Sequence, residues 1–85
     1  MEKVKMEIAR IHKLDGEGPL RAFCDVTLFD AFMVKGLKVL EGKEGLYVGM
    51  PSELGKDGKW HNTFMPLNKD IREELDRTIL EAYAG

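Results

Sequence analysis

The chain has 85 residues, of which 44% are hydrophobic and 33% are charged, and its formal net charge is −2. These values indicate one small domain, residues 1–85, and argue against a uniformly basic nucleic-acid-binding surface. No apolar run approaches the roughly 18 residues of a membrane helix, so we expect a cytoplasmic protein that contacts no membrane. The single cysteine, Cys24, cannot form an internal disulfide. Because so short a chain buries little surface, we expect self-association to support it.

Alternating side chains in the first part of the chain predict two antiparallel strands. Val4, Met6 and Ile8 alternate with charged residues, which predicts a strand over residues 3–12. Residues 14–19 contain two glycines and a proline and predict the connection that reverses the chain. The next predicted strand has one apolar face, which comprises Leu20, Ala22, Cys24, Val26 and Leu28. Its other face is polar except for Phe23.

Two further strands follow. Residues 29–31 predict a short turn into a strand over residues 32–40, in which Gly36 would tolerate a bulge or a close backbone approach. Glycines within residues 41–45 suit a tight hairpin into residues 46–50, and Pro51 ends that strand. Residues 52–62 carry charges around two glycines and are expected to form an exposed, mobile loop.

The last segment has helical periodicity. Asn68 is a favourable N-cap, and an apolar residue recurs every four positions at Ile71, Leu75, Ile79 and Tyr83. An amphipathic helix must cover an apolar face, and the preceding sheet offers one. The sequence therefore predicts an α+β fold, an antiparallel sheet of about four strands with a C-terminal amphipathic helix packed on one face.

Several motifs resemble those of the stage V sporulation protein G (SpoVG, septation) family. They are VKGLKVLEG at residues 34–42 and GLYVGMPS at residues 45–52, followed by Asp57-Gly58 and an aromatic residue, Pro66-Leu67-Asn68, Arg72, and ILEAY at residues 79–83. The resemblance runs without a large gap from about residue 6 to residue 83. It implies an antiparallel sheet with a C-terminal helix, a homodimer, and a bacterial gene regulator that binds DNA or RNA, is linked to septation and sporulation, and performs no catalysis.

The chain departs from the family pattern at two places. Glu53 and Leu54 follow Ser52, where the family commonly has basic residues. The family's helix commonly has a second basic residue two positions after its arginine, whereas here Glu73 and Glu74 follow Arg72. Each cation that neutralises a phosphate adds to affinity through counterion release. We therefore expect weakened nucleic-acid binding at physiological salt.

Basic residues in the 52–62 loop and at the helix start form the candidate nucleic-acid-binding patch. The helix N-terminus adds a field that favours anions. Trp60 could stack on an unpaired base, but a large aromatic residue in a small domain is more often packing material, so burial is the favoured interpretation. The predicted site residues are Lys56, Lys59, His61, Lys69 and Arg72.

Other residue types give no sign of catalysis, a metal or a cofactor. Cys24 lies on an apolar strand face and is expected to be buried and inert. His12 and His61 lack a companion at metal-ligand spacing, and Glu73 and Glu74 point about 100° apart on a helix. We therefore expect no enzyme, no metal, no cofactor and no small-molecule substrate.

An alternative from a different class is a non-catalytic, homodimeric interaction module that has lost nucleic-acid binding. A small sheet has two edges, and unpaired edges accept further strands. Phe29, Phe32 and the first strand are the apolar surfaces most able to support such an assembly. Added salt separates the alternatives, because it weakens phosphate contacts and leaves an apolar interface intact.

Overall fold

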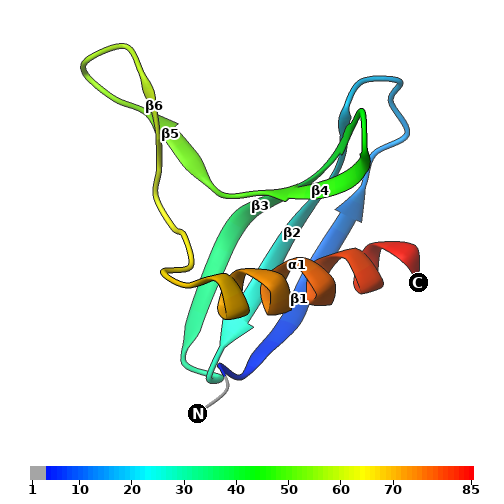
Figure 1. Ribbon diagram of the computed structural model, residues 1–85, viewed down its shortest axis with the longest axis vertical. Helices are drawn as coiled ribbons and strands as arrows, with labels where there is room; N and C mark the ends of the chain where they lie inside the picture. The colour runs from blue at the N-terminus through cyan, green and yellow to red at the C-terminus, as the bar shows by residue number, and fades with distance from the viewer. Residues whose placement is uncertain (1–3) are drawn as a thin grey trace.

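The computed structural model describes residues 4–85 as a four-stranded antiparallel sheet with one helix across it and a separate two-stranded hairpin (Figure 1). The sheet has the strand order β1-β2-β3-β4, and β5 and β6 pair with each other as a second sheet. This arrangement confirms the predicted α+β fold. The elements are β1 (Met6–Lys13), β2 (Leu20–Leu28), β3 (Phe32–Gly42), β4 (Gly45–Gly49), β5 (Ser52–Leu54), β6 (Trp60–Asn62) and α1 (Lys69–Ala84).

The sheet strands lie close to their predicted positions. β1 extends to Lys13, while Lys3, where that strand was expected to begin, lies outside the described residues. The predicted turn between β2 and β3 is present. Phe29 and Asp30 both have φ of 55°, and the Ala31 N–H donates to the Leu28 carbonyl at 2.9 Å. Two successive positive φ values make a type I′ turn, whose twist matches that of the flanking strands.

Bulges interrupt the register of the sheet and decide which face each side chain occupies. The β1–β2 register shifts between Ile8 and Arg10, which places Arg10 beside Asp25. The β2–β3 register shifts opposite Asp25, where Gly36 has a φ of 85°, so a bulge is present at the glycine that was expected to tolerate one. A further shift places Leu20 opposite Leu40, away from the apolar face on which it was predicted to lie.

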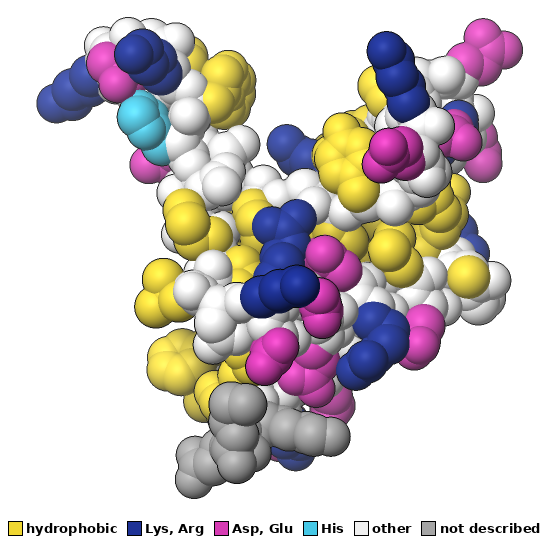
Figure 2. Space-filling model, in the orientation of Figure 1, with side chains coloured by type: hydrophobic (Ala, Val, Ile, Leu, Met, Phe, Trp, Pro, Cys, Tyr) yellow, Lys and Arg dark blue, Asp and Glu magenta, His cyan; other side chains and the backbone are white. Residues whose placement is uncertain are grey.

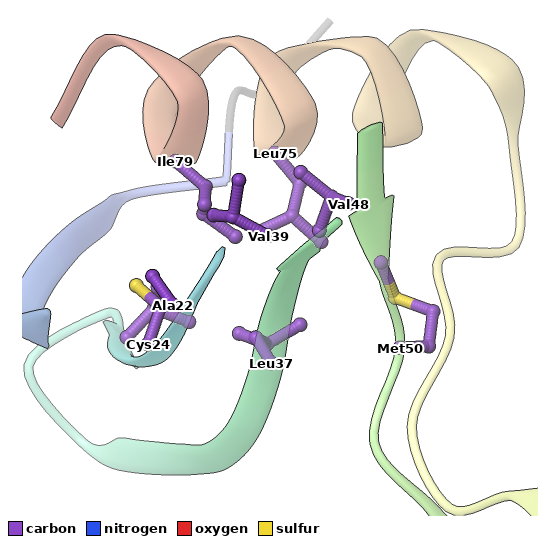
Figure 3. Close-up of a cluster of buried hydrophobic side chains, with 9 residues drawn as sticks. Ala22, Cys24, Leu37, Val39, Val48, Met50, Leu75 and Ile79 are labelled. Carbon is purple, nitrogen blue, oxygen red and sulfur yellow. The ribbon is translucent and has the colours of Figure 1, made fainter. Parts of the chain in front are cut away.

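The core lies between α1 and one face of the sheet. Figure 3 shows Leu75 and Ile79 of α1 pointing towards Val39 of β3 and Val48 of β4. Every buried side chain in the described chain is hydrophobic. The buried residues are Ala22, Cys24, Val26, Leu37, Val39, Val48, Met50, Pro51, Leu75 and Ile79.

Cys24 is buried, as predicted. Burial raises the pKa of the Cys24 thiol to about 11, because the thiolate would lose its hydration. At neutral pH the side chain is therefore a neutral thiol that packs as a small hydrophobic residue.

Both ends of α1 are capped. The Asn68 side chain accepts the Ile71 N–H at 2.9 Å, which confirms the predicted N-cap, and the Gly85 N–H donates to the Glu81 carbonyl at 3.1 Å. Within residues 4–85, α1 and the rest of the chain offer no helix with the length and apolar character that a membrane crossing requires.

Candidate nucleic-acid interface

Residues 52–62 form a β-hairpin, not the mobile loop that the sequence suggested. We call this hairpin the arm, and we call β1–β4 with α1 the body. The register pairs Ser52 with Asn62 and Leu54 with Trp60, and the Gly55 N–H donates to the Lys59 carbonyl at 2.8 Å. Figure 1 shows the arm projecting away from the body.

A short turn closes the tip of the arm. The Gly58 N–H donates to the Gly55 carbonyl at 3.1 Å, and Gly58 has a φ of 80°. A turn that ends on a glycine with positive φ is a common way to join two strands through three residues. The pair Asp57-Gly58 is itself a hairpin signal, so the sequence contained the information that predicts this turn.

Asp57 and His61 order the polar face of the arm. Oδ1 of Asp57 accepts the Lys59 N–H at 3.0 Å, and both carboxylate oxygens lie 3.1 Å from Nε2 of His61. The Lys59 N–H first, and His61 second, lower the pKa of Asp57. A Cβ atom at position 55 would come within 2.8 Å of the His61 ring and of the Asp57 carboxylate, so a larger residue there would displace this pair. The His61 side chain therefore contacts Asp57 within the arm.

Trp60 is exposed, which contradicts the interpretation that it packs in the core. Its exposed fraction is 68%, and that of Leu54, its cross-strand partner, is 59%. The physical reason is that the arm leaves the body, so no apolar layer lies beneath these two side chains. The tryptophan is available to a ligand or a partner.

Lys56 and Lys59 are the predicted site residues whose ammonium groups form no ion pair among the described residues. Among the described residues, no carboxylate oxygen lies within 4.0 Å of either ammonium group. Figure 2 shows basic side chains at the end of the arm, with acidic side chains beside them and hydrophobic side chains on the flank. A cationic tip next to an exposed aromatic residue can bind phosphates and stack on a base.

Lys69 and Arg72 lie at the start of α1, apart from the tip of the arm (Figure 1). The ammonium of Lys69 is 3.9 Å from Glu73. Arg72 donates through Nε to Asp76 at 3.0 Å and through Nη2 to the Val48 carbonyl at 2.9 Å. The structure therefore divides the predicted patch into two parts, and Arg72 fastens α1 to β4.

Acidic residues accompany both parts of the divided patch. Glu53 is paired with His61 across the arm, and Glu73 and Glu74 lie in the first half of α1. The helix surface in Figure 2 shows mixed cations and anions. The arm tip is thus the stronger cationic feature of the two.

Metal-binding side chains are not brought together in the part of the chain that the structure describes. Over residues 4–85, no group of three His, Cys, Asp or Glu side chains is placed to hold a metal ion. The arm combines two lysines, an exposed aromatic ring and the contact between Asp57 and His61, a set of groups suited to binding.

The fold and arm define a small α+β protein with a projecting hairpin, and comparisons with known proteins identify its family. The sequence model of the SpoVG family matches residues 1–85. The chain therefore belongs to the SpoVG family, as the motifs in its sequence indicated.

Three relatives illustrate the similarity, and each is named "Putative septation protein SpoVG". The protein of Archaeoglobus fulgidus is 42% identical over 74 residues, which cover 87% of each chain. That of Lachnospira eligens is 39% identical over 74 residues, covering 87% of this chain and 84% of the relative. That of Staphylococcus carnosus is 36% identical over 80 residues, covering 94% of this chain and 75% of the relative.

Proposed function

We propose that this SpoVG-family protein is a cytoplasmic regulatory protein that binds nucleic acid, either DNA or RNA. The process that it controls is septation or sporulation. The observation that carries the proposal is the arm tip, where Lys56 and Lys59 have no carboxylate within 4.0 Å among the described residues and Trp60 is 68% exposed. The names of the relatives support the link to septation. The proposal contains no catalytic step, metal or cofactor.

Affinity is expected to be modest. Glu53 and Asp57 contribute negative charges to the arm, and the helix-start cations are paired with acids: Lys69 with Glu73 and Arg72 with Asp76. Since affinity depends on how many phosphates are neutralised, this distribution leaves few cations for counterion release. Glu53→Lys is expected to tighten binding and steepen its salt dependence.

A second candidate function is assembly without nucleic acid, and we include self-association in the proposal. The outer edge of β1 pairs with no described strand, and the cross-strand pair of Leu54 and Trp60 is exposed on the arm. An unpaired edge and an exposed apolar pair both favour contact with a second copy. Light scattering at micromolar concentration should give the mass of a dimer; a monomer would contradict self-association.

The test of nucleic-acid binding is fluorescence anisotropy with labelled single-stranded and duplex oligonucleotides at low and physiological salt. Binding is expected to weaken with added salt. Replacement of Lys56 or Lys59 with Ala should reduce the slope of log K against log salt by about 0.7 for single strands or about 0.9 for duplex.

A matched control is Lys43→Ala, which removes one charge from a turn of the body. It produces the same net charge as each arm variant, so it reports any effect of the overall field. Equal losses for the Lys43 and arm variants would contradict a site on the arm. Absence of binding at low salt would instead favour the assembly function.

A further inference from the structure

Phe23 is an aromatic residue on the sheet face that α1 does not cover. We call this the open face. In the register, His12 of β1 and Lys38 of β3 lie on either side of Phe23, whereas Ala22 and Cys24 face the core. The Phe23 side chain is 40% exposed. Among the described elements none packs over this face, so part of the ring remains accessible to a ligand.

The open face contains a shallow depression around Phe23. Its volume is about 320 Å³, at the lower end of the range for ligand pockets, and its lining residues are Arg10, His12, Phe23, Asp25 and Gly36. Both register shifts near Asp25 contribute, because one brings Arg10 onto this face and the other bends β3 at Gly36. The Gly36 N lies 3.4 Å from the Asp25 Oδ1 that accepts its hydrogen bond.

Arg10 and Lys38 place a cation on each side of the Phe23 ring. Lys38 lies directly across from Phe23 on β3, whereas Arg10 lies diagonally from it on β1, beside Asp25. Diagonal neighbours are about 7–8 Å apart, which is within reach of a long side chain. In the described chain, neither has a carboxylate oxygen within 4.0 Å. Packing two such faces against each other would bring like charges together, which disfavours a second copy as the occupant.

These features fit one ligand chemistry. An accessible ring between cations matches an unpaired base with its phosphates, because bases stack on aromatic side chains while cations follow the backbone. A duplex fits poorly, since its bases are already stacked and a four-stranded face, roughly 14 Å across, is wider than the roughly 12 Å major groove. We infer that the open face binds single-stranded nucleic acid, with a base on Phe23 and phosphates at Arg10 and Lys38.

This inference rests on the proposed function and assigns it a second surface, distinct from the arm. The test compares Phe23→Ala and Phe23→Leu with Phe32→Leu, a control that changes an exposed phenylalanine of β3. Anisotropy is measured with single-stranded and duplex oligonucleotides, light scattering gives the oligomeric mass, and circular dichroism checks folding. Single-strand binding should weaken about 5- to 150-fold in Phe23→Ala, with duplex binding and the Phe32 control unchanged.

The possible failures are distinguishable. If the wild-type protein binds oligonucleotides and both Phe23 variants bind them equally well, the open-face inference is wrong and the arm proposal stands. If the wild-type protein binds none, the proposed function itself is wrong. A lower oligomeric mass in the Phe23 variants would show that the face joins two copies and would overturn the inference. Should the Phe23 variants not fold, Lys38→Ala provides the same comparison, with a smaller expected loss.

Discussion

The body and the arm of this molecule are held in shape by different interactions. The body contributes eight of the ten buried residues, whereas no side chain of residues 52–62 is buried. The arm depends on a short ladder, two glycines and the contacts of Asp57. Because an isolated two-stranded hairpin is marginal in water, the arm contributes little to global stability. Substitutions in the body should therefore change stability, and substitutions in the arm should change binding.

The largest effect is expected at Leu75, which is 1% exposed on the sheet-facing side of α1. Leu75→Ala should lower the free energy of unfolding by about 2–5 kcal/mol, because it removes buried methyl groups and leaves a cavity. The matched change in the arm, Leu54→Ala, should stay within about 0.5 kcal/mol. Urea unfolding followed by far-UV circular dichroism measures both. Similar losses for the two variants would contradict the division between body and arm.

Arg72 tests whether a predicted binding residue belongs to the body. Arg72→Ala should destabilise the protein by about 1–3 kcal/mol, because it deprives the Val48 carbonyl and Asp76 of a charged donor. Arg77→Ala removes an exposed arginine from the same helix and should have little effect on unfolding. If Arg72→Ala kept wild-type stability and lost oligonucleotide binding, Arg72 would be a nucleic-acid-binding residue and its role in the body would be contradicted.

The N-cap of α1 should have a smaller effect. Asn68→Ala removes the acceptor of the Ile71 N–H and should cost about 1 kcal/mol in unfolding free energy. Asn62→Ala, at the end of β6, is the control in the arm and is expected to be nearly neutral. Thermal melts compare the two variants directly. Equal melting temperatures would show that the cap does not support the body.

The smallest effect concerns the pH dependence of the arm. Contacts with the Lys59 N–H and His61 hold the folded-state pKa of Asp57 below its ordinary value of 3.8. Stabilisation by the carboxylate is therefore complete above that ordinary value and is lost as pH falls through the lowered pKa. Trp60 emission should change between about pH 5 and pH 2 in the wild type. The change should be reduced in Asp57→Asn; matching profiles would contradict the role of the carboxylate.

Much of the body could be predicted from local patterns. Alternation placed Ala22, Cys24 and Val26 in the core, and the four-residue period with an asparagine cap located α1. Bulges were harder to predict, because strict alternation from Ile8 would place Arg10 on the buried face. The shift between these two residues reverses that assignment and is determined by pairing with β2.

The candidate site was less predictable, because it depends on where whole elements lie. Burial of Trp60 was expected from its residue type, whereas its exposure follows from the arm leaving the body. No local signal showed that Arg72 reaches the Val48 carbonyl, a contact between residues 24 positions apart. The pair Asp57-Gly58 did signal a turn, and giving that pair more weight would have predicted the hairpin.

The most direct test of the central claim uses Trp60, the one tryptophan of the chain, as a reporter of the arm. Its emission is measured while a single-stranded oligonucleotide is added at low salt, and salt is then raised. We predict quenching that salt reverses and that is weaker in Lys56→Ala and Lys59→Ala. Binding detected by anisotropy without any change in Trp60 emission would contradict the assignment of the arm as a nucleic-acid contact.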